Sequence, residues 1–536
     1  MNVTEILRAQ VAAHPERVAL VDAATRRTLT YAEPNRTMQR TLTYAELDAA
    51  TARVAAALRA RGLRAGETVL IVNPVSLELY VALIGMLRAG LVPAIPPPGA
   101  GVAAIAQCAH KHPPTAVLAS GIGWAALAAS AELRHALRLS TTATPFAYDV
   151  MRAHNGDASG AIEPCADGAP AMLTFTSGST GEPKALIRSH GVARAQVEAL
   201  GKALALDGAT SLCTMPIVLL AELAAGATCL LPGVDLRRPA RADAALLAER
   251  MRTHDVARIV ASPALLANLA AALHTRGETL PALRLIASGG APVMPPLADA
   301  LRAIAPNARV LAVYGSTEAE PIASLDAADV APADHDAMRA GAGLLAGVPC
   351  AGGTVAIVAT RRAAVHGPFA DDDAIERDAL PPYAAGEIIV SGPHVVPHYL
   401  ERADDAATKI RAGMRMWHRT GDLGYFDERG RLWLAGRASA ALDDARGTME
   451  PLRVECALAY LPEIARTALA AADGARVLVI EPLAGAHVDE QAVRAAVAFA
   501  HIDRVIVAPV PVDPRHNAKV DYAALNHLVR RYTRAA

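Results

Sequence analysis

The sequence predicts an α/β fold: a large N-terminal domain of parallel-rich sheets with flanking helices, followed by a small, mobile C-terminal α+β domain. In the middle of the chain, short apolar segments alternate with helical ones. Buried strands are predicted at residues 257–262, 283–290 and 308–318, separated by helical stretches at 263–277 and 294–306. Strands connected by helices of this length pair in parallel through right-handed crossovers. Ligands of such sheets bind at the carboxyl ends of the strands, where SGGAP (288–292) and YGSTE (314–318) lie.

The pattern changes near Gly436 and Arg437. Residues 438–451 (ASAALDDARGTMEP) are polar and rich in turn formers, and shorter helices and strands follow them. We therefore predict a large domain over residues 1–436 and a small domain over 437–536, joined by a hinge. The heptapeptide RTLTYAE occurs twice, at 27–33 and 40–46. We interpret this repeat as a tandem duplication that lengthened a surface hairpin.

Composition excludes several classes of protein. A chain of 536 residues is too long for one ordinary core. Its 52 basic and 53 acidic residues do not indicate a nucleic-acid partner. The longest apolar run, 217–232, contains Glu222 and is shorter than the ~20 residues of a transmembrane helix. The charged amino terminus does not resemble a secretion signal, and six scattered cysteines without a CxxC pair favour a reduced, cytoplasmic setting.

Residues 173–190 (LTFTSGSTGEPKALIRSH) form a loop rich in glycine and hydroxyl side chains. It is not a Walker loop, because Gly178 and Gly181 are too close together, Pro183 precedes Lys184, and Ala185 stands where a hydroxyl is required. Its glycines and backbone N–H groups could still bind the oxygens of a pyrophosphate. The alternative is a solvated Ser/Gly turn, which the preceding apolar strand makes less attractive.

The segment FTSGSTGEPK resembles the signature loop of the adenylate-forming superfamily, which includes acyl-CoA synthetases, peptide-synthetase adenylation domains and luciferases. Further matches follow in the order of that family along nearly the whole chain. They are LTYAEL (42–47), GMLRAGLVPAIPP (85–97), SGGAP, YGSTE, GEIIVSGP (386–393), RTGDLGYFDERGRLWLAGR (419–437) and NAK (517–519). The resemblance implies that a carboxylate attacks the α-phosphate of ATP, giving an acyl-AMP and pyrophosphate. Because two anions meet, Mg2+ and protein cations are expected.

The resemblance also implies a role for each matching residue. The loop would close over the β- and γ-phosphates, and the adenine would lie between residues 289–292 and Tyr314. Glu318 would ligate Mg2+ through a carboxylate oxygen, Asp422 would bind the ribose hydroxyls, and Lys519 would bridge the substrate carboxylate and the α-phosphate. The implied nucleotide-binding residues are Thr176, Ser177, Gly178, Ser179, Thr180, Gly181, Lys184, Gly289, Gly290, Ala291, Pro292, Tyr314, Gly315, Ser316, Thr317, Asp422 and Arg437. The implied catalytic residues are Lys519, Thr180 and Glu318.

Simpler readings stay open at this point. Glu318 could be a surface carboxylate, TGD around Asp422 a turn, and Lys519 a solvated lysine. His418 and Arg419 precede TGD, and the sequence does not decide whether they reach the site. The sequence gives no oligomeric state.

The RTGD and NAK segments are similar to those of the beta-lactone synthetases of bacterial olefin biosynthesis. Such enzymes adenylate a beta-hydroxy acid, whose own hydroxyl then displaces AMP without a thiol. Ala440 stands where most of the superfamily has an aspartate pivot for rotating the small domain, which puts thioester formation in doubt. The expected substrate is a fatty or beta-hydroxy fatty acid. The alternatives are an acyl-CoA ligase, with CoA as a further substrate, and a catalytically inactive nucleotide-binding member.

Overall fold

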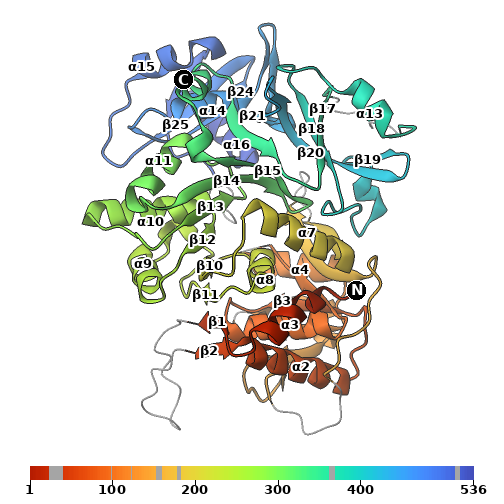
Figure 1. Ribbon diagram of the computed structural model, residues 1–536. Helices are drawn as coiled ribbons and strands as arrows, with labels where there is room; N and C mark the ends of the chain where they lie inside the picture. The colour runs from red at the N-terminus through yellow and green to blue at the C-terminus, as the bar shows by residue number, and fades with distance from the viewer. Residues whose placement is uncertain are drawn as a thin grey trace. The chain divides into compact units, whose positions relative to one another are not determined.

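The computed structural model describes residues 1–22, 40–97, 99–121, 123–152, 160–177, 183–360, 369–512 and 519–535. These residues form two compact units (Figure 1). Unit 1 comprises Met1–Arg237, Ala242–Val260 and His398–Asp405, and unit 2 comprises Arg238–Arg241, Ala261–Pro397 and Ala406–Ala536. Both combine helices with sheets, so the predicted α/β class is confirmed.

Unit 1 contains a seven-stranded sheet in the order β7-β6-β5-β3-β4-β8-β9. All neighbouring pairs are parallel except β8 and β9. Its strands are β3 (Thr68–Val72), β4 (Val92–Ile95), β5 (Ala116–Ala119), β6 (Leu137–Ser140), β7 (Tyr148–Asp149), β8 (Pro170–Ser177) and β9 (Pro183–Ser189). Leu70, Val117, Leu173 and Phe175 from these strands are buried in one core cluster. Within this sheet, β3, α3 (Leu77–Arg88) and β4 form a strand–helix–strand unit whose two strands are parallel.

A second group of strands in unit 1 has the order β12-β10-β11-β1-β2. The members are β1 (Val18–Asp22), β2 (Arg40–Thr43), β10 (Ser211–Cys213), β11 (Cys229–Leu231) and β12 (Arg258–Ala261). β1 and β2 pair antiparallel, as the two arms of a hairpin do. The second RTLTYAE copy forms β2 and the start of α2 (Tyr44–Ala60), where Thr43 and Glu46 make a capping box. The first copy lies outside the described residues.

In unit 2, β13 (Leu285–Gly289) and β14 (Arg309–Ser316) are parallel, as the intervening helix α11 (Pro295–Ile304) requires. From β14 onward the pairing is antiparallel, in the order β14-β15-β16-β21-β20-β18-β17, and β19 also pairs with β20. These strands are β15 (Ala319–Asp326), β16 (Leu344–Pro349), β17 (Thr354–Val358), β18 (Gly386–Ser391), β19 (Lys409–Ala412), β20 (Arg415–Phe426) and β21 (Leu432–Arg437). The unit is therefore less parallel than the sequence suggested, because β14 and β15 are joined by two residues, too few for a crossover.

The last hundred residues form the predicted α+β region within unit 2. It contains the hairpin β22–β23 (Leu442–Asp444, Gly447–Met449), helices α14 (Pro451–Leu458), α15 (Glu490–Ala496) and α16 (Tyr522–Ala535), and the sheet β24-β25-β26 (Ile464–Ala472, Ala475–Pro482, Arg504–Val507). Leu452 and Cys456 of α14 share a buried cluster with Leu432 and Leu434 of β21. Since this region packs onto the rest of unit 2, a domain boundary at residue 436 and a rotation about it stay predictions.

Each of the six cysteines carries a free thiol, and the cytoplasmic location expected from their spacing stays a prediction. In the described part of the chain, no helix combines the length and the apolar character that crossing a bilayer requires.

Candidate functional site

The carboxyl ends of β13 and β14 bring two of the predicted segments together in unit 2. Ser288 and Gly289 pair in parallel with Ala312 and Val313, so the SGGAP and YGSTE segments leave the sheet side by side. A Cβ on Gly289 would lie 2.7 Å from the carbonyl oxygen of Val313, and Gly290 has a φ of +83°. Glycine is required at both positions. At 289, strand β14 approaches too closely for a side chain, and at 290 the backbone adopts a left-handed conformation that favours glycine. Ala291 and Pro292 continue this loop to α11.

Tyr314 reaches a second set of predicted residues. Its hydroxyl donates a hydrogen bond to Asp422 Oδ2 at 2.8 Å, although the two residues are 108 positions apart. Arg437 Nε lies 3.1 Å from Asp422 Oδ1, and Arg437 Nη1 donates to the carbonyl oxygen of Thr420 at 2.9 Å. The Asp422 N–H donates to Thr420 Oγ1, which fixes the turn of TGD. The sequence predicted Tyr314, Asp422 and Arg437 as separate ligand contacts, and the structure joins them in one polar chain.

The protonation states within this chain follow from its surroundings. Burial, reinforced by the negative charge of Asp422, raises the pKa of the Tyr314 hydroxyl well above its usual value. The carboxylate of Asp422 raises the pKa of Arg437, and the charge of Glu318 acts in the same direction. The tyrosine therefore remains a hydrogen-bond donor and the arginine remains charged at neutral pH.

Thr317 and Glu318 form the turn between β14 and β15, where the backbone carbonyl of Glu318 accepts a hydrogen bond from Val396 N–H at 2.8 Å. The Glu318 carboxylate is close enough to influence the pKa values of both Arg437 and His418. Glu318 and Asp422 therefore belong to one cluster. Gly315 lies in the same bend, and a Cβ there would be 3.0 Å from the carbonyl oxygen of Ala319.

Two hydroxyl groups at these strand ends lack partners. In the described residues, Ser288 Oγ and Ser316 Oγ are buried without a hydrogen bond. A buried hydroxyl without a protein partner is costly, so both groups retain the capacity to hydrogen-bond a ligand. Both belong to the segments that the sequence assigned to nucleotide binding.

The two residues that precede TGD, His418 and Arg419, have different surroundings in the structure. Arg419 Nη2 lies 2.6 Å from Glu387 Oε2, and the exposed fractions of these side chains are only 12% and 3%. Arg419 is therefore held within the sheet by β18. His418 is buried beside Lys409, and burial together with that lysine lowers its pKa to about 3. It is neutral at physiological pH and lies within electrostatic range of Glu318.

Lys519 belongs to the described residues and directly precedes the short stretch that leads into the last helix. Val520 next to it bridges to Val512, and Tyr522 starts α16. Burial raises the pKa of the Tyr522 hydroxyl, and the positive charge of Arg437 acts in the opposite direction, so the two side chains lie within electrostatic range of each other. The segment that carries Lys519 therefore lies near the Arg437 end of the polar chain.

In unit 1, β8 and β9 flank the predicted phosphate loop, and Thr176 pairs with Lys184 across them. Lys184 Nζ lies 3.7 Å from Asp404 Oδ1 and 5.5 Å from the ring centre of Tyr399. Asp404 Oδ2 also lies 3.6 Å from Lys111 Nζ. Gly178, Ser179, Thr180 and Gly181 lie outside the described residues, and the side chains of Thr176 and Ser177 are not described, so their roles stay predictions.

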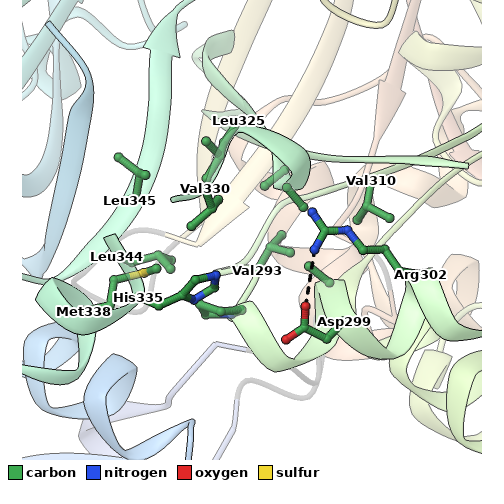
Figure 2. Close-up of a pocket in the computed structure, with 14 residues that line it drawn as sticks. Val293, Asp299, Arg302, Val310, Leu325, Val330, His335, Met338, Leu344 and Leu345 are labelled. Atoms are coloured by element: carbon green, nitrogen blue, oxygen red, sulfur yellow. Dashed lines mark hydrogen bonds and ion pairs between the residues drawn. The ribbon is translucent and has the colours of Figure 1, made fainter. Parts of the chain in front are cut away.

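Figure 2 shows an apolar pocket that adjoins the SGGAP and YGSTE segments. Val293 directly follows Pro292, and Ala312 lies two residues before Tyr314 on the same face of β14. The pocket continues past Val310 and Leu325 to Met338. The ion pair between Asp299 and Arg302 stands at its edge.

Sequence reasoning missed two residues near the site, Glu455 and Tyr522. Glu455 on α14 accepts a hydrogen bond from the Tyr522 hydroxyl at 3.2 Å, and burial raises the pKa of Glu455 to about 7. The only signal in the sequence was a glutamate among apolar residues in LRVECALAYL, which does not by itself indicate burial.

Comparison with known proteins identifies relatives along nearly the whole chain. A family model described as AMP-binding enzyme matches residues 7–400. The olefin beta-lactone synthetase of Stenotrophomonas maltophilia is 33% identical over 500 residues, covering 88% of both chains. That of Xanthomonas campestris pv. campestris is 34% identical over 533 residues, covering 92% of this chain and 89% of the relative.

Solved structures show the same fold. The structure of the amide bond synthetase McbA from Marinactinospora thermotolerans superposes with a TM-score of 0.78 at 21% identity, covering 98% of this chain and 99% of that one. The match extends through the C-terminal α+β region.

Proposed function

Because the chain belongs to the AMP-binding enzyme family and is an adenylate-forming ligase, we propose that it activates a fatty or beta-hydroxy fatty acid and closes the product to a beta-lactone. The observation that carries this proposal is the identity of 33% and 34% to two olefin beta-lactone synthetases over most of the chain. Ala440, a buried residue of the short 3-10 helix Ala438–Ala440, also supports it. An apolar side chain there cannot make the charged contacts of an aspartate pivot, and lactone closure needs no rotation to admit a thiol.

The reaction has two steps. First, an oxygen of the substrate carboxylate bonds to the α-phosphorus of ATP, and the bond to the bridging oxygen of the β-phosphate breaks, so pyrophosphate leaves with the electron pair. Second, the oxygen of the beta-hydroxyl group attacks the acyl carbon and releases its proton to a base. The bond from that carbon to the AMP oxygen then breaks, giving a four-membered lactone and AMP.

In this proposal, the polar chain in unit 2 binds the nucleoside. The ring of Tyr314 and the loop of Gly289–Pro292 hold the adenine, and Asp422 accepts hydrogen bonds from the ribose hydroxyls. Arg437 orients Asp422 through their ion pair. Thr317, with Ser316 and Gly315 in the same bend, binds the α-phosphate, and the unpartnered Ser316 hydroxyl supports a ligand at this point.

Lys184 and the loop from Thr176 to Gly181 are proposed to bind the β- and γ-phosphates, since one lysine and a row of N–H and O–H donors suit a polyphosphate. Lys519 is proposed to neutralise both anions as the new P–O bond forms. An amine contributes most where charge develops in the transition state.

Mg2+ fits the residues of this site. No group of three or more His, Cys, Asp or Glu side chains able to hold a metal occurs within the described ranges, but Glu318 offers a carboxylate beside the proposed phosphate site. Mg2+ in nucleotide sites is commonly held by one or two carboxylates, phosphate oxygens and water. When bound, the ion would supply charge compensation for the phosphates.

The test is product analysis by mass spectrometry. The 536-residue chain is incubated with ATP, Mg2+ and a panel of straight-chain fatty acids and their beta-hydroxy counterparts, with and without CoA. We expect AMP, pyrophosphate and a neutral product lighter than the beta-hydroxy acid by one water, formed without CoA. A thioester formed only with CoA would identify an acyl-CoA ligase instead, and no ATP–pyrophosphate exchange with any acid would favour a binding-only protein.

A further inference from the structure

The backbone around Lys519 is fixed to the start of α16. Val520 bridges to Val512, and the Asp521 N–H donates to the carbonyl oxygen of Pro511 at 2.9 Å. The Asp521 side chain then accepts from the N–H of Ala524 at 2.9 Å, inside the first turn of the helix. A displacement of this first turn would therefore move Lys519 as well.

Tyr522 is the residue that ties this turn to the rest of the C-terminal region. Its ring packs against a buried cluster that includes Leu525 and Val529 of α16. Its hydroxyl donates to Glu455 Oε1 of α14 at 3.2 Å. α14 is itself held at both sides, because Leu452 packs into a cluster with β21 and Val454 packs into a cluster with α15.

Among the described residues, three groups from α14, α16 and β21 surround or influence this hydrogen bond. Tyr522 of α16 binds Glu455, the thiol of Cys456 lies next to Glu455 on α14, and Arg437 at the end of β21 acts electrostatically on Tyr522. The nearest arginine on α14, Arg453, pairs with Glu450 at 3.0 Å. Tyr522 is therefore hydrogen-bonded to a half-buried carboxylate and lies within electrostatic range of the arginine that pairs with Asp422.

We propose that Tyr522 and Glu455 are positioning residues for Lys519: their hydrogen bond fixes the first turn of α16 and thereby holds the terminal lysine near the Arg437 end of the site. This inference rests on the proposed function, in which Lys519 acts at the α-phosphate. Neither side chain touches the reacting atoms in this assignment. Their effect is on the placement of the lysine.

The test is ATP–pyrophosphate exchange by the 536-residue chain, with the acid that the wild type activates best. Tyr522→Phe removes only the hydroxyl, and Tyr532→Phe is the control, because that ring is exposed on the same helix. We expect Tyr522→Phe to lower kcat about tenfold while KM for ATP changes less than about twofold, since a misplaced lysine affects the transition state more than ground-state binding. Tyr532→Phe should match the wild type.

Glu455→Gln separates positioning from general stability. The amide oxygen can still accept the tyrosine proton, so only the charge is lost. Because ionisation strengthens such a hydrogen bond, the ratio of wild-type kcat to Glu455→Gln kcat should rise as pH increases through about 7, where Glu455 ionises. Substrate ionisation affects both proteins equally and cancels in the ratio. Tyr522→Phe combined with Glu455→Gln should be no slower than Tyr522→Phe alone, because both changes act on one contact.

The possible outcomes of these experiments separate the positioning role from the proposed function. A normal kcat in Tyr522→Phe, or a pH-independent ratio for Glu455→Gln, overturns the positioning role while leaving the proposed function intact. A wild type that shows no exchange with any acid overturns both.

Discussion

Tyr314 and Asp422 are joined by a hydrogen bond of 2.8 Å, and Arg437 occupies the other carboxylate oxygen at 3.1 Å. Both oxygens of Asp422 are thus oriented by neighbours from β14 and β21. In the proposed function, the same carboxylate accepts hydrogen bonds from the ribose hydroxyls. What this requires is that Asp422 is held in one orientation, and either neighbour alone can contribute to holding it.

Tyr314→Phe should therefore weaken ATP binding modestly, because the ring remains and Arg437 still orients Asp422. We expect KM for ATP to rise about fivefold, corresponding to the loss of one ordinary hydrogen bond. Asp422→Asn also loses the ion pair with Arg437, and KM should rise about fiftyfold because charge-assisted bonds are stronger. Pyrophosphate exchange at varied ATP measures both. An unchanged KM in Asp422→Asn would contradict the ribose assignment.

Lys519→Ala should reduce adenylation by about a thousandfold, because a cation placed at developing charge accounts for several kcal/mol of transition-state stabilisation. Lys202→Ala is a suitable control, since that side chain is 63% exposed and forms a surface ion pair with Glu198. Single-turnover formation of acyl-AMP is the appropriate measurement. A near-normal rate would mean that the terminal lysine has been misassigned.

The sequence predicted the strands of the site well but not their contacts. The β13, α11 and β14 segments were predictable, because apolar runs and helical spacing alternate there, and SGGAP and YGSTE fall at the strand ends as expected. The bond between Tyr314 and Asp422 was not predictable, since it depends on how β20 and β14 are placed within an antiparallel arrangement built by distant strand pairs. That arrangement follows from the short Thr317–Glu318 turn, which excludes a crossover.

The same limit applies to single side chains. His418 and Arg419 are adjacent in sequence, and only the pairing of β18 with β20 brings Arg419 to Glu387. Glu455 resembles any exposed helical glutamate until α16 covers it. Burial of a charged group results from tertiary packing, which local periodicity does not encode.

Asp404→Asn should strengthen pyrophosphate binding. Asp404 lies 3.7 Å from Lys184 and 3.6 Å from Lys111, so its negative charge competes with a phosphate for both lysines. Removing that charge should lower KM for pyrophosphate in the reverse reaction about threefold, the scale of a partly exposed ion pair. Asp235→Asn, at a 50% exposed side chain, is the matched control. Weaker pyrophosphate binding in Asp404→Asn would show that the carboxylate orients Lys184 instead.

The pocket of Figure 2 predicts that the enzyme accepts ATP analogues with a substituted adenine ring. Val293 and Ala312 adjoin the proposed adenine site, and the wall behind them is apolar. ATP analogues with an apolar substituent at the exocyclic amine or at carbon 2 should be used with a KM within about threefold of that for ATP. The free energy gained by burying the substituent offsets the entropy lost in ordering it. Ala312→Leu narrows the pocket and should penalise the analogue about tenfold more than ATP, because overpacking is costly. Equal penalties would place the base elsewhere.

Glu455 should make the stability of the protein depend on pH. Burial raises its pKa from 4.5 to about 7, so between these values the folded chain retains a proton that the unfolded chain has lost. The stabilisation from this group is therefore complete below about pH 4.5, falls as pH rises toward 7, and is constant above pH 7.

Glu455→Gln removes the ionisable group. Its free energy of unfolding relative to wild type should increase by about 2 kcal/mol between about pH 5 and pH 8, less than the full pKa shift implies because the side chain is only half-buried. Glu428→Gln, at an exposed position, provides the control. Denaturant unfolding followed by a tryptophan or circular-dichroism signal at the two pH values measures the difference. If wild type and Glu455→Gln keep the same stability difference at both, the carboxylate is ionised throughout, and the pH dependence expected of kcat must disappear with it.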